Sequence, residues 1–196
     1  MLTLALLANT VAGSSHQLAV ADVRGDAYVS FMRDFEDAVT QFGSSSGTFV
    51  DCAVHYGPAS FDVFSTYEHL ALSKLTANGA PDLTVMYPNP TMLCDHPFAI
   101  LARASTEQVT AAKVFRDYLL APDQQRLALS VGLRPSSSSI RLADANVPGN
   151  LFARHLPGLQ VALQSTIAAA PSGDVVDALI DEWTQFYQDR PTTPGC

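Results

Sequence analysis

Apolar residues recur at helical spacing in several stretches of the chain. Between Asp26 and Phe42 they lie three or four positions apart and Gly43 follows them, which predicts an amphipathic helix with a glycine stop. A second stretch covers 111–119, and Ser105 with Gln108 three residues on forms a capping-box pattern before it. We therefore expect an amphipathic helix in both places.

The second helix leads into a third. The apolar positions of the second helix share one side of the helical turn, and they are Ala111, Val114, Phe115, Tyr118 and Leu119. Pro122 suits the first turn of the next helix, and Gly132 can adopt the left-handed conformation that ends it. A last helix is expected to open at Ser172 and to end at Arg190-Pro191. Trp183 lies on its apolar face and is predicted to pack in a core or between domains.

Short β-rich runs alternate with these helices. Helical patterns also cover 48–56 and 67–75, whereas 61–65, 83–87 and 98–102 have the composition of buried strands. Helices that alternate with short buried strands predict an α/β class.

Composition limits the classes of protein to consider. The chain has 196 residues, of which 47% are hydrophobic and 15% charged, so one large domain or two small ones can form a packed core. A net charge of −8 argues against nucleic acid, because affinity there comes largely from Lys and Arg on phosphates. No stretch has the roughly 20 apolar residues that cross a bilayer.

The first fifteen residues have two interpretations. The run MLTLALLANTVAGSS is apolar and ends in small residues like a signal peptide, yet no Lys or Arg precedes it. The other interpretation is a structural helix at the edge of a domain.

Three cysteines permit at most one internal disulfide. Cys52–Cys94 is the expected pair, which leaves the thiol of Cys196 at the end of the chain.

Five features follow one another along the chain in a recognisable order. They are Tyr67-Glu68 after a predicted strand, an extended segment around Tyr87-Pro88, a strand after Asp95-His96-Pro97, a helix pair ending in Gly132-Leu133-Arg134-Pro135, and the last helix with Trp183. This order resembles the C-terminal portion of bacterial extracellular solute-binding proteins of family 11, which are related to molybdate and sulfate receptors.

The resemblance implies both a fold and a function. The fold is α/β and type 2 periplasmic-binding-protein-like, without the N-terminal part of lobe one; residues 1–85 form a lobe-two-like region, and residues 86–196 form the crossover strands and a lobe-one-like helical region. The function is non-enzymatic capture of a small polar or anionic solute in an inter-lobe cleft, as the receptor of an ABC-type uptake system. The implied location is extracellular or in the cell envelope, from a longer precursor. The implied partners are the solute and a membrane permease or a von Willebrand factor A domain, with no cofactor.

The resemblance also implies where the solute binds. The expected ligand-binding residues lie at a strand end and at the crossover, and they are Ser65, Thr66, Tyr67, Glu68, Tyr87 and Asn89. The charge of Glu68 would repel an anion unless this side chain turns away or meets a cation. Alternatively, Tyr67 and Glu68 only begin a helix, with Tyr67 in the core and Glu68 favouring the helix dipole. Arg134 is a candidate to cap a helix or to pair with a carboxylate.

Two enzyme-like or metal-like patterns compete with this interpretation. The segment Gly43–Gly47 (GSSSG) matches G-x-S-x-G, but the nucleophile elbow needs a strand before it, and here a helix is predicted. A hydrolase would require esterase activity that Ser45→Ala abolishes. Cys52-x-x-His55 and Cys94-x-His96 supply four zinc-type ligands, although the second spacing offers no turn to wrap a metal. Buried cysteines and surface histidines are the alternative, and no metal is expected.

A scaffold without a working ligand site is the alternative from another class. A chain that lacks part of lobe one would expose apolar surface and associate with a partner or with itself.

Overall fold

Two compact units built from interleaved segments make up the chain. The computed structural model describes residues 2–13, 17–77 and 82–187. Unit 1 consists of the segments Met1–Ser65, Tyr87–Leu93 and Leu163–Cys196, and unit 2 of Thr66–Met86 and Cys94–Ala162. The chain therefore passes between the units near residues 65, 86, 93 and 162. The predicted division at residues 85 and 86 falls beside one of these passages, and each predicted region contributes to both units.

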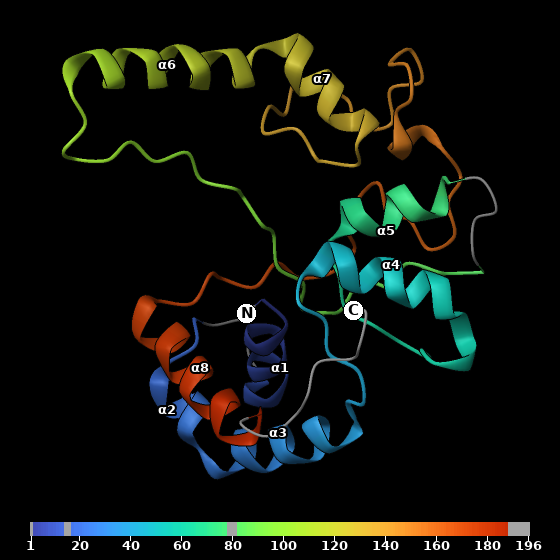
Figure 1. Ribbon diagram of the computed structural model, residues 1–196, viewed down its shortest axis with the longest axis vertical. Helices are drawn as coiled ribbons and strands as arrows, with labels where there is room; N and C mark the ends of the chain where they lie inside the picture. Colours follow the sequence, from blue (N-terminus) through green and yellow to red (C-terminus); the bar gives the residue numbers. More distant parts are fainter. Residues whose placement is uncertain (1, 14–16, 78–81, 188–196) are drawn as a thin grey trace. The chain divides into compact units, whose positions relative to one another are not determined.

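Unit 1 is helical. Its helices are α1 (Leu2–Ala12), α2 (Val20–Arg24), α3 (Asp26–Ala38), α4 (Ser46–Tyr56) with the 3-10 turn η1 (Gly57–Ala59), and α8 (Gly173–Tyr187) (Figure 1). The core forms where α1, α3 and α8 bring together Ala5, Met32 and Leu179, all of which are buried. The structural-helix interpretation of the first residues is thus confirmed for α1, whose apolar side lies in this core. Trp183 packs against the same core, as predicted.

Unit 2 contains fewer helices and more irregular chain. Its elements are α5 (Glu68–Leu75), α6 (Thr106–Leu120), α7 (Pro122–Ser130) and the 3-10 turn η2 (Leu151–Ala153). Buried Leu72, Leu129, Leu151 and Phe152 form a separate core. Gly132 ends the α7 region with φ +78°, as predicted, and a Cβ there would lie 3.1 Å from the Cα of His69.

The predicted α/β, type 2 periplasmic-binding-protein-like fold is wrong. None of the predicted strands over 61–65, 83–87 and 98–102 forms a ladder. Across the described ranges the only β pairing is one isolated parallel bridge, Thr91↔Ile167, with Thr91 N–H donating to Thr166 O and Ala168 N–H donating to Thr91 O, both at 2.8 Å. A β-rich run forms a strand only where a neighbouring strand supplies backbone hydrogen-bond partners. In this chain a loop residue is the partner instead: Val85 N–H donates to Pro157 O at 3.0 Å.

None of the helices described for this chain is long and apolar enough to cross a membrane.

Candidate functional site

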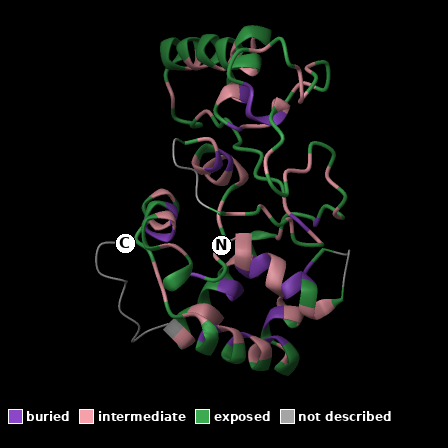
Figure 2. Ribbon diagram, turned by 90° about the vertical axis from the view of Figure 1, so that its right-hand side faces the viewer, coloured by how far each residue is buried: buried purple, intermediate pink, exposed green. Residues whose placement is uncertain are grey.

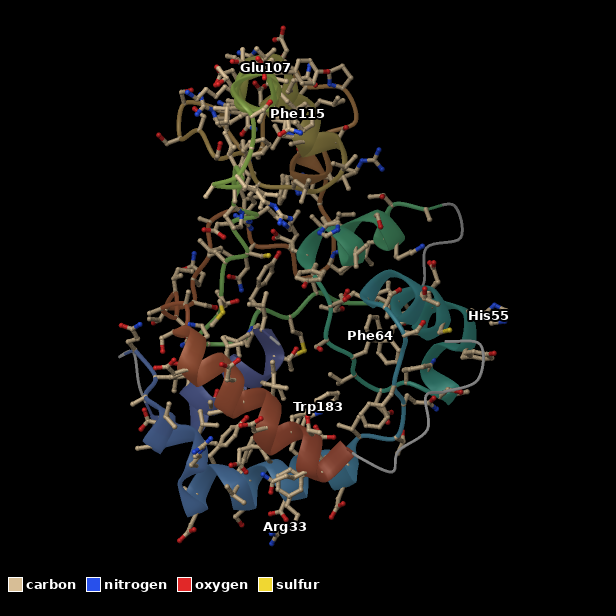
Figure 3. All side chains as sticks on the ribbon, turned by 60° about the vertical axis from the view of Figure 1, so that its left-hand side comes forward. Arg33, His55, Phe64, Glu107, Phe115 and Trp183 are labelled. Carbon is tan, nitrogen blue, oxygen red and sulfur yellow. The ribbon has the colours of Figure 1, made fainter. Side chains whose placement is uncertain are left out.

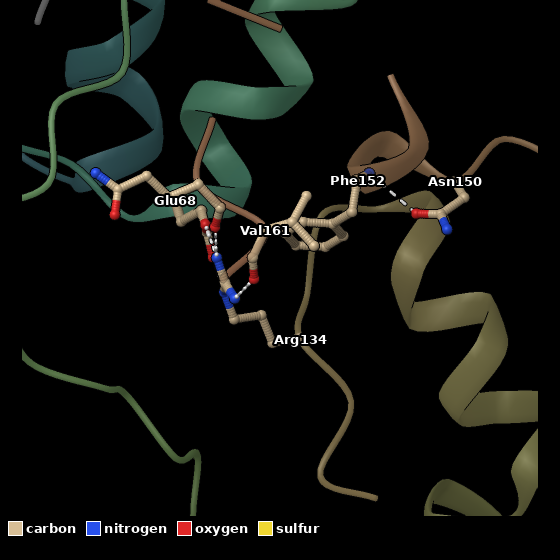
Figure 4. Close-up of polar contacts among 6 residues, drawn as sticks. Glu68, Arg134, Asn150, Phe152 and Val161 are labelled. Carbon is tan, nitrogen blue, oxygen red and sulfur yellow. Dashed lines mark hydrogen bonds and ion pairs between the residues drawn. The ribbon is translucent and has the colours of Figure 1, made fainter. Parts of the chain in front are cut away.

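The most densely connected polar group in unit 2 is an ion pair between Glu68 and Arg134. Glu68 is the first residue of α5, and Arg134 follows α7 in an extended segment. The guanidinium donates from Nε to Glu68 Oε2 and from Nη2 to Oε1, both at 2.8 Å, in the two-pronged geometry that suits arginine and carboxylate (Figure 4). Both side chains are largely buried, with exposed fractions of 21% for Glu68 and 23% for Arg134.

Arg134 also bonds the loop that follows η2. Its Nη2 donates to Gln160 O at 2.6 Å and its Nη1 to Val161 O at 3.0 Å, so at least four of the five guanidinium N–H groups have acceptors. The Cζ atom lies 5.3 Å from the centre of the Phe152 ring, within cation–π range. Arg134 thus ties together α5, η2 and the 160–161 segment.

Asn150 fixes the ring under the guanidinium. Its Oδ1 accepts from Phe152 N–H at 2.9 Å and begins η2 (Figure 4). Its Nδ2 donates to Leu142 O and to Asp144 O, each at 2.9 Å. The buried amide is therefore satisfied by its own loop, and Phe152 is held in the core.

The ion pair neutralises the charge of Glu68, which would otherwise repel an anion. Glu68 meets a cation, and the expectation that Arg134 pairs with a carboxylate is confirmed. The group is neutral overall, and its donors serve the protein's own carbonyls, which describes a structural brace better than an anion receptor. The alternative in which Tyr67 and Glu68 begin a helix is confirmed for α5, but Tyr67 is exposed and stacks on His69 at 5.9 Å rather than lying in a core.

The expected ligand-binding residues fall in both units. Thr66, Tyr67 and Glu68 belong to unit 2, where Thr66 Oγ1 is buried without a hydrogen-bond partner. Ser65, Tyr87 and Asn89 belong to unit 1.

Two of the expected ligand-binding residues in unit 1 make hydrogen bonds within that unit. Ser65 Oγ lies 3.2 Å from Thr3 Oγ1, and Asn89 Oδ1 accepts from Thr166 N–H at 2.9 Å. In unit 2, Tyr67 and Glu68 are neighbours at the start of α5, where Tyr67 is the N-cap residue. Their binding of a solute stays a prediction.

His69, the second residue of α5, has a lowered pKa. Burial lowers the pKa of His69 from its ordinary value of 6.5, the nearby His96 lowers it further, and Glu68 opposes both effects. His96 itself has a left-handed backbone, with φ +46°.

The predicted Cys52–Cys94 disulfide is wrong. Cys52 is disulfide-bonded, whereas Cys94 is a free, exposed thiol. Cys196 lies outside the described residues. A cysteine in a disulfide cannot ligate a metal, so the four-ligand zinc pattern loses Cys52. The other half of the pattern is present, with Cys94 Sγ 3.9 Å from His96 Nδ1. The described ranges contain no group of three or more metal-type ligands.

Ser45, the central serine of the GSSSG segment, caps α4. Its Oγ accepts from Thr48 N–H at 3.2 Å and donates to Thr48 Oγ1 at 2.8 Å. From residue 17 up to this serine, the structure contains helices and irregular chain and no strand. The strand–turn–helix context of a nucleophile elbow is therefore missing.

The sequence pattern missed the exposure of α6. This helix carries the predicted capping box, with Ser105 Oγ accepting from Gln108 N–H at 3.3 Å and Gln108 Oε1 accepting from Ser105 N–H at 2.8 Å. However, none of its fifteen residues is buried, and Figure 2 shows it as almost continuously exposed. We call the apolar positions of this helix, together with the ring that touches them, the α6 face; its members are Phe98, Ala111, Val114, Phe115, Tyr118 and Leu119.

The α6 face is a continuous apolar surface. The rings of Phe98 and Phe115 lie 6.1 Å apart, and the five large side chains have exposed fractions from 40% to 66%. Phe115 is labelled in Figure 3. Helical periodicity revealed which residues share this side, but periodicity carries no information on what covers it.

No family model, curated protein or solved structure matches the chain. Function is therefore argued from its own residues.

Proposed function

We propose that this chain is a non-enzymatic interaction domain that acts outside the cytoplasmic membrane and binds a protein surface through the α6 face. The observation that carries the proposal is a fifteen-residue helix whose apolar side has no partner within the described part of unit 2. Contiguous exposed apolar surface of this kind is typical of protein interaction sites.

The nature of the exposed residues supports binding over accidental exposure. Phe98, Phe115 and Tyr118 are aromatic, and aromatic side chains are enriched at the centres of interfaces. Most formal charges of α6 lie elsewhere on the helical turn, where Arg116 pairs with its neighbour Asp117 at 2.7 Å. Glu107, in the first turn, lies at the end of the apolar side. The surface is thus apolar at its centre and polar at its edge, as in protein interfaces.

The location has separate support. Cys52 is disulfide-bonded, and structural disulfides form and persist in oxidising compartments. This agrees with an extracellular or cell-envelope location.

A photo-crosslinking experiment tests the interaction. A photoreactive phenylalanine analogue replaces Val114 in the full chain, in cells that produce it, and a matched control carries the analogue at Val63, which is 82% exposed in unit 1. We expect a protein adduct at position 114 and none at 63. Equal labelling at both positions, or no adduct at 114, contradicts the proposal.

Solute capture is the second candidate. The observation that favours it is that Ser65, Thr66 and Tyr87 flank passages of the chain between its two units, as residues near a crossover should. On this proposal the chain is the receptor of an ABC-type uptake system, with a permease or a von Willebrand factor A domain as its protein partner. A thermal-melt panel of oxyanions, amino acids, sugars and polyamines tests it, because a ligand at about 100 times its Kd adds about 2.7 kcal/mol. No shift with any class would contradict solute capture and leave the interaction proposal standing.

A further inference from the structure

We propose that the partner of the α6 face is a second copy of this chain, so that the protein forms a two-fold symmetric dimer through antiparallel α6 helices. This inference rests on the proposed function, since it names the occupant of the same surface. Three independent features of the described residues support it.

The first feature is the dependence of α6 on a partner. Isolated helices of about 12–15 residues are marginal in water, and most helical stability in proteins comes from the packing of an apolar side. The capping box stabilises the first turn of α6, and Gln125 Nε2 donates to Leu119 O at 2.8 Å at its last turn. Between these two ends no side chain of the helix is buried. Packing against a second α6 would supply the missing burial.

The second feature is area. A half-exposed large apolar side chain presents on the order of 100 Å² to solvent, so the five large members of the α6 face present roughly 500 Å² per copy. Two copies together would bury about 1,000 Å², which is the lower limit for a specific interface. Leu127 on α7 and Val131, the residue that follows this helix, are both more than half exposed and add further apolar surface. The area therefore suffices for a reversible dimer of moderate affinity.

The third feature is self-complementarity. A two-fold axis at Phe115 places Leu119 of one copy opposite Ala111 of the other, because the two positions lie four residues on either side of the axis. A large side chain thus meets a small one twice, which lets the helices approach closely. Lys113, Arg116 and Asp117 lie on the remaining sides of the turn, and Glu107 lies on the apolar side two helical turns before Phe115. The two copies of Glu107 would therefore lie at opposite ends of the helix pair, and no like charges face each other beside the axis.

Sedimentation velocity over a concentration series tests the dimer. The protein used in this experiment carries the substitution Cys94→Ser, because the free thiol of Cys94 would otherwise link copies covalently. We expect a reversible monomer–dimer equilibrium with a Kd of roughly 1–100 µM. Val114→Glu and Phe115→Glu should each weaken dimerisation by at least about 100-fold, because a carboxylate from each copy would be desolvated beside the axis. Val63→Glu, the same valine-to-glutamate change at an exposed residue in unit 1, should leave the Kd unchanged.

Each outcome separates this inference from the proposed function. In dilute, monomeric protein, far-UV circular dichroism should be the same for both α6 variants and the parent, since neither residue is buried in the single chain. A parent chain that stays monomeric at several hundred micromolar, or a dimer that Val114→Glu and Phe115→Glu do not weaken, overturns the second-copy inference. In the crosslinking experiment, an adduct at position 114 of twice the chain mass supports it. An adduct of another mass overturns it while the interaction proposal stands, and the lack of any adduct overturns both.

Discussion

Arg134 shows how one side chain can hold a loop-rich unit together. Unit 2 has few helices, and long irregular segments need bonds that helices would otherwise supply. One guanidinium bonds Glu68 on α5, the carbonyls of Gln160 and Val161, and the ring of Phe152. Since these partners are 18 to 66 residues away along the chain, Arg134 closes several loops at once.

Replacing Arg134 should therefore be costly. Arg134→Ala leaves Glu68 and two carbonyls without their donor in a largely buried place, and we expect a loss of about 2–4 kcal/mol in the free energy of unfolding. The matched control is Arg116→Ala, whose pair with Asp117 is exposed and should contribute less than about 1 kcal/mol. Urea unfolding followed by circular dichroism measures both. Similar losses in the two variants would show that the Glu68 pair is not a brace.

His69 makes the stability of unit 2 depend on pH. Its pKa is lowered by burial and by His96, so the folded state binds fewer protons than the unfolded state as pH falls through the unfolded value of 6.5. The melting temperature should therefore fall between about pH 7.5 and about pH 5.5. His69→Asn should reduce this fall, whereas His55→Asn, at an exposed position of α4, should not. A pH dependence unchanged by His69→Asn would assign the effect to other groups.

At the scale of elements, helices were predictable and strands were not. The helices predicted over 48–56 and 67–75 are present within two residues of their limits, because periodicity, caps and stop signals act within one segment. The last helix begins at Gly173, one residue after its predicted start, and its predicted end at Arg190-Pro191 lies outside the described residues. The predicted helix from Asp26 ends earlier, at Ala38, where Val39 is already extended. A strand depends on a distant neighbour, and the runs at 61–65, 83–87 and 98–102 have none in the described structure.

The candidate site likewise has some features that the sequence predicted and others that it did not. The start of α5 and the pairing of Arg134 with a carboxylate could be predicted, because each follows from local charge and helix chemistry. The choice of Glu68 as the partner, the bonding state of Cys52 and the exposure of α6 depend on long-range packing, which periodicity does not contain.

The cap of α6 offers a test at the level of the element. Ser105→Ala removes the hydroxyl that accepts from Gln108 N–H and that lowers the pKa of Glu107 by hydrogen bonding. Loss of such a cap costs about 1 kcal/mol, so amide exchange in the first turn of α6 should accelerate roughly 5-fold in dilute, monomeric protein. Global unfolding should change little, because no residue of α6 is fully buried. Ser45→Ala removes the same kind of cap from α4, which carries buried Val50 and Cys52, and should instead lower global stability.

At the scale of the whole molecule, the two units have separate hydrophobic cores. The core of unit 1 comes from α1, α3 and α8, and that of unit 2 from α5, α7 and η2. Cooperative unfolding follows from shared packing, and separate cores form separate cooperative regions. The molecule should accordingly unfold in more than one transition.

The single tryptophan makes this testable, since Trp183 reports on unit 1 whereas circular dichroism reports on both units. Arg134→Ala should move the part of the circular-dichroism transition that belongs to unit 2 and leave the midpoint of Trp183 fluorescence in place. Leu179→Ala removes a fully buried side chain from the unit 1 core and should lower the stability of that unit by about 2–5 kcal/mol. It should move the midpoint of Trp183 fluorescence and leave the unit 2 part of the circular-dichroism transition in place. If either substitution shifts both signals together, the units unfold as one cooperative body. A brace such as Arg134 would then stabilise the whole chain instead of unit 2, because the loss of one core would carry the other with it.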